Sequence, residues 1–280
     1  MMSKGAVRSV KPTVSYGALI ALALFLMAPF IWMVLVSLHP SKSAIPPLRE
    51  IVPSVPEWSN YKTVLTMRDI PVLRFLLNSI IVSTSVVLGQ LFICSLAAFG
   101  FSRIKFKGRE YLFLLFVMSL MFAGPVLQIP VYLLVRSMGW LDTYWALIVP
   151  GLSSAFNVFL LRNFFLQIPL ELDEAARIDG AGEFRIYWKV VLPLSKAALA
   201  TAGAFTFFAV WTDFFWPLLA TNSMDMRTLE VGLSVFKNSY GGTNWPLQMT
   251  AAVIVMLPLL VAFLFSQKYF VKGITMGSIK

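Results

Sequence analysis

The stretch "PLELDEAARIDGAGEFRIYWKVVLPLSKAAL", residues 169–199, is the most polar sustained segment of a 280-residue chain in which 58% of residues are hydrophobic. Pro169 suits the first turn of a helix, and the acidic residues that follow it complement the positive end of the helix dipole. Gly180 and Gly182 are suited to end that helix. The segment therefore predicts a short helix over about 170–179.

A second helix is predicted after the glycines. Phe184, Tyr187, Trp188 and Val191 follow the spacing of one apolar helix face. We expect this amphipathic helix to end before Pro193, so the whole segment forms a helix-turn-helix elbow. Two interpretations stay open at this point: a docking surface for another protein, or a solvated loop with an apolar anchor.

The composition indicates an integral membrane protein. Only 13% of residues are charged and the mean hydropathy is +0.78, whereas about a quarter of the residues in soluble domains are charged. The formal net charge is +10, but the basic residues lie in short clusters between apolar runs. This pattern favours membrane-topology signals over nucleic-acid binding.

Six apolar windows are long enough to cross a bilayer. They cover residues 14–37, 76–101, 111–135, 143–161, 197–220 and 249–270. The predicted fold is an all-α membrane protein with six transmembrane helices, one domain over 1–280, and the elbow in a loop over 162–196. Gly124, Pro125 and Pro130 interrupt the third window, which predicts a bend or a kink there.

The distribution of Lys and Arg predicts the orientation. With the N-terminus in the cytoplasm, the inner segments hold nearly twice as many Lys and Arg residues as the outer ones, and "SRIKFKGRE", residues 102–110, is the densest cluster. We therefore expect both termini and the elbow in the cytoplasm. Outer loops are expected over 38–74 and 221–248.

Polar residues inside apolar windows are candidates for a transport pathway, because burying them in lipid is unfavourable. An aromatic cluster over 203–217 suits the apolar faces of sugar rings, and a carboxylate beside it suits sugar hydroxyls. Helix packing and interfacial anchoring are the alternatives. The candidate substrate-pathway residues are Gln128, Asn157, Phe208, Trp211 and Asp213.

The sequence offers little evidence for a metal-binding or nucleotide-binding site. Cys94 and His39 are the single cysteine and the single histidine, so a Cys- or His-rich metal site cannot be assembled within the chain. The phosphate-loop pattern G-x-x-x-x-G-K-[ST] does not occur. If ATP drives this protein, the ATPase is another chain.

The elbow resembles the cytoplasmic signature of binding-protein-dependent ABC importer permeases, which reads EAA, three residues, G, nine residues, I, one residue, LP. Val190 stands here in place of the Ile. The resemblance extends to "NSIIVSTSVVLGQLFICSLAAFGFSRIKFKGRE", "WTDFFWPLLAT" and "QKYFVKGITMGSIK", and it is strongest to the carbohydrate-uptake branch and its maltose-type second permease subunit.

The resemblance implies a transport subunit without its own catalytic or metal site. It would reside in the inner (cytoplasmic) cell membrane, pair with a second homologous permease, and receive solute from an extracytoplasmic binding protein. An ATP-binding subunit dimer would carry the ATP and Mg and dock on the elbow. The residues that would couple to this ATPase are Glu174, Ala175, Ala176, Asp179, Gly180, Leu192 and Pro193.

Three rival functions remain. An ion-driven secondary transporter would require ionisable residues in mid-span, and Asp213 is the clear candidate. An intramembrane enzyme would require paired carboxylates, a Ser/Lys dyad or His ligands within the spans, and no persuasive arrangement is visible. An ABC permease for a non-sugar solute, such as an amino acid or a glycerophosphate-type compound, would share the elbow and the spans.

Overall fold

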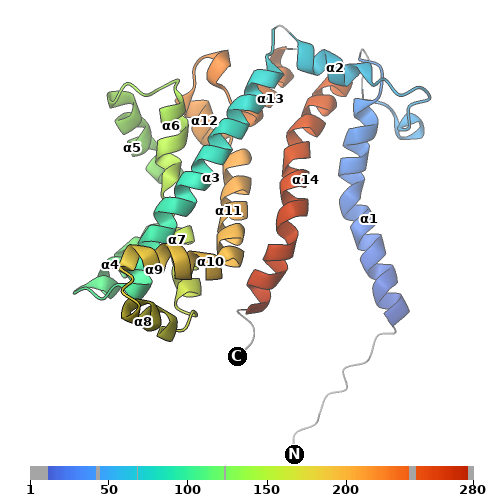
Figure 1. Cartoon of the computed structure of the whole chain (residues 1–280). Helices are drawn as coiled ribbons and strands as arrows, with labels where there is room; N and C mark the ends of the chain where they lie inside the picture. Colours follow the sequence, from blue (N-terminus) through green and yellow to red (C-terminus); the bar gives the residue numbers. More distant parts are fainter. Residues whose placement is uncertain (1–11, 42–44, 68, 123, 240–243, 277–280) are drawn as a thin grey trace, which may run out of the picture. The chain divides into compact units, whose positions relative to one another are not determined.

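A computed structural model describes residues 12–41, 45–67, 69–122, 124–239 and 244–276, and every regular element among them is a helix (Figure 1). The α-helices are α1 Pro12–Ser37, α2 Ser59–Thr66, α3 Val72–Arg103, α4 Arg109–Met118, α5 Gly124–Ser137, α6 Tyr144–Ile148, α7 Ala155–Phe165, α8 Glu171–Ile178, α9 Glu183–Ile186, α10 Leu192–Leu194, α11 Lys196–Trp211, α12 Phe215–Ala220, α13 Leu229–Ser239 and α14 Trp245–Met276. Residues 1–11 and 277–280, which were expected in the cytoplasm, lie outside the described part.

The chain divides into two compact units, which we describe separately. The first contains residues up to 64 together with 237–254. Its buried Asn60 donates hydrogen bonds from Nδ2 to the carbonyl oxygens of Ser37 and His39, both at 2.8 Å, and so fixes the end of α1 against α2. Thr250 Oγ1 donates to the same Ser37 carbonyl at 3.2 Å. The side chains described along α1 before this junction are mostly exposed and apolar, as expected for a lipid-facing helix.

The second unit contains residues 65–236 and 255–280, and its core is formed by α3, α7 and α11. Small buried side chains at Cys94, Ala98, Ala198 and Ala202 let the helices approach closely. Close approach of small residues is how helices associate in lipid, where there is no hydrophobic driving force between them. These three helices hold the elbow at one of their ends (Figure 1).

Three helices of the described chain are individually long and apolar enough to span a membrane: Leu19–Ser37, Val72–Arg103 and Trp245–Gln267. Three further candidates consist of two helices joined at a bend. Arg109–Met121 meets Val126–Ser137 at 102°, Tyr144–Leu152 meets Ala155–Phe165 at 41°, and Glu183–Leu194 meets Lys196–Trp211 at 80°. The first two bends therefore divide the windows predicted at 111–135 and 143–161. The third bend, at Ser195, precedes the window predicted at 197–220, which is divided instead between α11 and α12.

Local chemistry explains two of these divisions. Ser154 accepts a hydrogen bond from the N–H of Asn157 at 3.3 Å and so starts α7 after the turn at Pro150 and Gly151. Asp213 Oδ1 accepts the N–H of Trp216 at 3.2 Å, at the start of α12. Helix-capping residues interrupt apolar runs without changing their mean hydropathy, which is why the windows looked continuous in the sequence.

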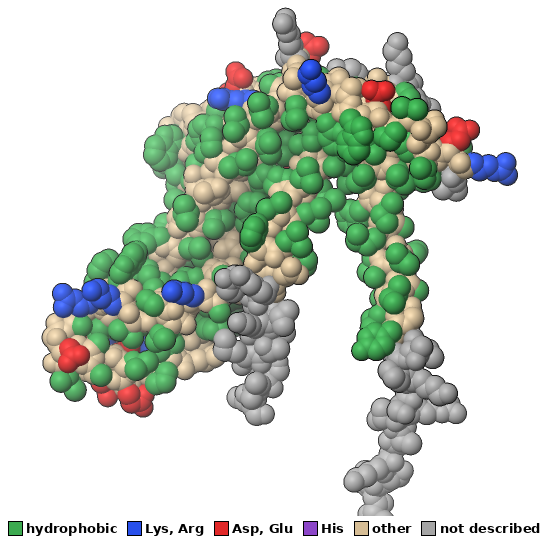
Figure 2. All heavy atoms as spheres, turned by 45° about the vertical axis from the view of Figure 1, so that its right-hand side comes forward, with side chains coloured by type: hydrophobic (Ala, Val, Ile, Leu, Met, Phe, Trp, Pro, Cys, Tyr) green, Lys and Arg blue, Asp and Glu red, His purple; other side chains and the backbone are tan. Residues whose placement is uncertain are grey.

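Charged side chains gather at the elbow end of the second unit, and hydrophobic side chains cover the surface along the helices away from it (Figure 2). Arg162 supports this end, because its Nη2 contacts both carboxylate oxygens of Glu110 at 3.0 and 2.9 Å. The Arg162 guanidinium also lies 3.9 Å from the ring centroid of Phe113.

Substitution of Gly232 tests how closely α13 packs against α3. A Cβ atom at this position would overlap the ring of the fully buried Phe75. We expect Gly232→Ala to lower the free energy of unfolding by about 1–3 kcal/mol, since overpacking a core forces side chains or backbone to move. The measurement is thermal unfolding of the purified protein in detergent.

Gly100→Ala is the matched control, because a Cβ at Gly100 meets no atom within 4 Å. It should leave the melting temperature unchanged or slightly raised, as Ala is the better helix former. Equal melting temperatures for the two variants would contradict the packing described for Gly232.

Candidate functional site

The first arm of the elbow is α8, which ends in a Schellman turn. The N–H of Ala181 bonds to the carbonyl of Ala176 at 2.9 Å, and the N–H of Gly180 bonds to the carbonyl of Arg177 at 3.0 Å. Gly180 has φ of +79°, the left-handed conformation that this turn requires. The helix extends over Glu171–Ile178, within one residue of the predicted ends.

The residues expected to couple to an ATPase divide by exposure. Five of the seven are exposed and form the outer surface of the elbow: Glu174, Ala175, Asp179, Gly180 and Pro193. Ala176 and Leu192 are half-buried and pack against the helix core. Ile178, which the sequence did not single out, is 86% exposed on α8. The outer surface therefore combines small, acidic and apolar side chains.

The inner side of α8 is fixed by a buried ion pair. Arg103, the last residue of α3, and Asp173, in the first turn of α8, are 6% and 0% exposed, with Nε and Oδ2 3.4 Å apart. Nη2 of Arg103 also donates to the carbonyls of Phe165 and Ile168 at 2.7 and 2.8 Å. One guanidinium thus joins the end of α3, the end of α7 and the start of α8.

The second arm differs from the predicted helix in two respects. It begins at Glu183 as α9 and continues through a π-helical turn over Tyr187–Val191 into α10, so Pro193 lies within the helical run. The N–H of Leu192 bonds to the carbonyl of Tyr187, five residues back. This wide turn relieves the clash that a proline ring makes with the preceding helical turn.

The apolar face of this arm is only partly covered. Tyr187 and Val191 are buried, and the Tyr187 hydroxyl is 2.8 Å from Oγ of Ser95 on α3. Phe184 and Trp188 are exposed, with stacked rings 6.5 Å apart. Of the four residues on the predicted apolar face, two therefore belong to the core and two to the surface.

An ion pair on the surface links the two arms. Arg177 Nε contacts Glu183 Oε1 at 2.9 Å, and both side chains are substantially exposed. Hydrogen bonding to Glu183 raises the pKa of the Arg177 guanidinium. Because exposed pairs contribute little to stability, we assign the positioning of α8 to Arg103 and Asp173.

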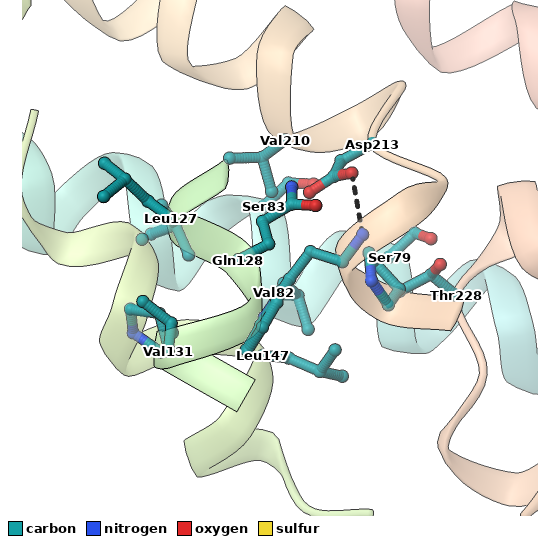
Figure 3. Close-up of a pocket in the computed structure, with 15 residues that line it drawn as sticks. Ser79, Val82, Ser83, Leu127, Gln128, Val131, Leu147, Val210, Asp213 and Thr228 are labelled. Atoms are coloured by element: carbon teal, nitrogen blue, oxygen red, sulfur yellow. Dashed lines mark hydrogen bonds between the residues drawn. The ribbon is translucent and has the colours of Figure 1, made fainter. Parts of the chain in front are cut away.

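A cavity of about 250 Å³ lies between helices of the second unit, away from the elbow (Figure 3). Residues from α3, α5, α11 and the segment around α12 line it. Two of the predicted pathway residues, Gln128 and Asp213, meet there although 85 positions separate them in the sequence. Most of the wall is aliphatic, including Val82, Leu147 and Val210.

The other three predicted pathway residues lie elsewhere. Asn157 is buried and donates from Nδ2 to Oε1 of Gln90 and, at 2.8 Å, to Oγ1 of Thr206. This cluster joins α7, α3 and α11. Trp211 is 3% exposed and donates from Nε1 to the carbonyl of Val255 at 3.2 Å. Phe208 lies on α11 and contacts Phe207, with ring centroids 6.1 Å apart.

Sequence reasoning missed Arg103 as a structural residue, because a cation in a basic cluster was assigned to topology. It also missed Ser79, Ser83 and Thr228 at the cavity, since hydroxyl residues are common in helices and loops. Asn78, on α3, is buried and donates to the carbonyls of Asp225 and Arg227 at 2.7 and 2.9 Å. Within the described ranges, no group of three or more His, Cys, Asp or Glu residues could hold a metal ion.

A helical, strongly apolar chain with a preformed polar elbow and an internal cavity is typical of membrane transport permeases. The family model described as "Binding-protein-dependent transport system inner membrane component" matches residues 90–276. The chain belongs to this family, whose members are the membrane components of ABC importers.

Named relatives agree with this assignment. The trehalose/maltose transport system permease protein MalG of Thermococcus litoralis is 37% identical over 265 residues, covering 93% of this chain and 94% of the relative. The sn-glycerol-3-phosphate transport system permease protein UgpE of Brucella abortus is 37% identical over 202 residues, covering 72% of each. A chain in the crystal structure of a bacterial ABC transporter that imports the acidic polysaccharide alginate matches with a TM-score of 0.80 and 25% identity, covering 96% of this chain and 100% of that one.

The buried ion pair gives a stability prediction. Arg103→Met leaves Asp173 and two carbonyls without their partner, and we expect a loss of about 3–5 kcal/mol in the free energy of unfolding. Asp173→Asn should destabilise less, because the carbonyl bonds of Arg103 remain. Chemical or thermal unfolding in detergent measures both effects.

Arg177→Met is the control on the same elbow and should change stability by less than about 1 kcal/mol, since its ion pair is exposed. If Arg103→Met and Arg177→Met destabilise equally, Arg103 does not hold the elbow.

Proposed function

We propose that this chain is one of two homologous permease subunits of an ATP-driven importer for a sugar, meaning an oligosaccharide or a related glycoside. The observation that carries the proposal is the elbow, whose outer surface is folded and exposed while its inner side is fixed to α3 and α7. The relatives named for trehalose, maltose and alginate support a saccharide as cargo.

The elbow is the proposed docking surface for an ATP-binding subunit dimer, which carries the ATP and Mg. Glu174, Ala175, Asp179 and Gly180 would contact that subunit, and Pro193 would lie at the edge of the contact. Ala176 and Leu192 would transmit its movement inward, because they pack on the core formed by α3, α7 and α11. The chain performs no covalent chemistry in this scheme.

The membrane arrangement is also proposed. Six spans act as one transmembrane domain over 1–280, with both termini and the loop 162–196 in the cytoplasm. The outer segments 38–74 and 221–248 would receive solute from an extracytoplasmic binding protein. The second permease subunit would complete the pathway, to which Gln128 and Asp213 contribute at the cavity, while Asn157, Phe208 and Trp211 hold the helices around it.

One alternative cargo has support. The relative named for sn-glycerol 3-phosphate is as similar in identity as the maltose-type relative, although it aligns over a shorter part of the chain. A glycerophosphate-type importer would use the same elbow and partners, so the two functions differ in the charge of the cargo. An ion-driven transporter is less favoured, because family members work with binding proteins.

The docking role of the elbow is tested at Gly180, where a Cβ is strained by the positive φ but meets no atom within 4 Å. We expect Gly180→Ala to reduce ATPase activity in the assembled complex by about threefold to tenfold, because distorting the turn misplaces the contact. Gly180→Trp should also reduce co-purification of the ATPase from native membranes.

Gly182→Ala is the matched control, since Gly182 has φ of −74° and equally open surroundings. It should retain both ATPase activity and co-purification. If no ATPase accompanies the unmodified protein, the proposed importer is wrong.

The orientation is tested by chemical labelling of a cysteine placed on the elbow. In a Cys94→Ala background, Gly182→Cys should react with a membrane-impermeant maleimide only when the cytoplasmic side is accessible. Val55→Cys, on the exposed outer loop, should react from the opposite side. Labelling of both positions from the same side would contradict the proposed topology.

A further inference from the structure

Two buried oxygens in the cavity have no hydrogen-bond partner within the described chain. They are Oε1 of Gln128 and Oγ1 of Thr228. A buried polar atom without a partner is unfavourable, and most such atoms in folded proteins are paired. Two of them around one cavity indicate a site whose partners come from a bound molecule.

Thr228 is held in place before any ligand arrives. The preceding carbonyl, of Arg227, accepts a hydrogen bond from Asn78 at 2.9 Å, and the following N–H, of Leu229, donates to Oγ of Ser79 at 2.8 Å. Thr228 is 6% exposed between these two anchors. Fixing a polar group in advance lowers the entropy lost on binding.

The polar groups of the cavity include acceptors as well as the amide N–H groups of Gln128 and the hydroxyls of Ser79, Ser83 and Thr228. The Asp213 carboxylate lines the cavity and uses Oδ1 to accept the N–H of Trp216, shown as the dashed line in Figure 3. A carboxylate accepts about four hydrogen bonds, so it retains capacity toward the cavity. Gln128 Oε1 is also an acceptor, while the Thr228 hydroxyl both donates and accepts. A matching ligand therefore brings several O–H donors.

The charge of the cavity disfavours anions. None of the described residues that line it is Lys, Arg or His, and Asp213 supplies a carboxylate. The adjacent Arg227 donates from Nη1 to Sδ of Met224 at 3.2 Å, and its buried Nε has no hydrogen-bond partner within the described chain, but Arg227 does not line the cavity. An anion in this space would face Asp213 without a compensating cation, at short range and partly shielded from water.

We infer that this cavity is a subsite for one neutral saccharide ring, in which Asp213, Gln128 and Thr228 bind hydroxyls and Val82, Leu147 and Val210 contact the apolar ring face. The inference rests on the proposed importer and specifies the charge of its cargo. This chain then selects against uronates and phosphate esters within the membrane, in addition to any selection by the external binding protein.

The test is equilibrium binding to the assembled transporter in lipid nanodiscs, without the external binding protein. Glucose and glucuronate are the probes, because they share a ring and differ in charge at C6. We expect glucose to bind at least about tenfold more tightly than glucuronate, and Asp213→Asn, which keeps the α12 cap, to reduce this ratio to below about threefold.

The hydroxyl contact is tested by Thr228→Val, which should weaken glucose binding by about threefold to tenfold through loss of one hydrogen bond. Thr212→Val is the matched control, because Thr212 is exposed, donates to the carbonyl of Phe208 and does not line the cavity. It should leave glucose binding unchanged.

The inference is overturned by no saturable glucose binding, by equal or tighter binding of glucuronate, or by equal effects of the two Thr→Val substitutions. If the transporter still assembles with its ATPase in those cases, the proposed importer function survives and the neutral subsite alone fails. Failure to recover the ATPase would instead remove the importer function itself.

Discussion

The position of the elbow depends on one guanidinium. Arg103 reaches from the last residue of α3 to two carbonyls after α7 and to the carboxylate of Asp173 on α8. A buried ion pair gains little over apolar packing in stability, but it is intolerant of losing one partner. Arg103 therefore acts chiefly as a geometric constraint: movement of α8 relative to α3 would separate buried charges. The elbow and the end of α3 are expected to move together.

The sequence predicted the first arm of the elbow well because local chemistry determines its ends, whereas the second arm continues through Pro193 instead of ending before it. The acidic first turn, the left-handed Gly180 and the alternation of charged and apolar residues act over a few positions, and α8 lies within one residue of its predicted bounds. The glycine and prolines at Gly124, Pro125 and Pro130 predicted the bend in the window 111–135, but the breaks in the windows 143–161 and 197–220 could not be predicted in the same way. These breaks depend on short caps such as Ser154 and Asp213, and an average over an apolar window does not detect single residues.

The functional roles of polar residues were harder to predict than their presence. Gln128 and Asn157 are both amides in apolar windows and both have an unpaired oxygen, yet Gln128 lies at a cavity whereas the Nδ2 group of Asn157 joins three helices. Only the neighbours from other helices distinguish them. Thr228 carried no signal at all, since its importance comes from Asn78 and Ser79, about 150 positions away, which fix the backbone around it.

The Schellman turn at Gly180 has a consequence for assembly. Because the turn is closed by hydrogen bonds within the elbow itself, α8 needs no partner to complete its fold. A partner that binds such a surface does not have to order it, so association is limited by encounter and orientation rather than by folding. If an ATP-binding subunit docks on the elbow as proposed, the permease can be made and inserted first and bind that subunit later, without passing through a half-folded state at the docking surface.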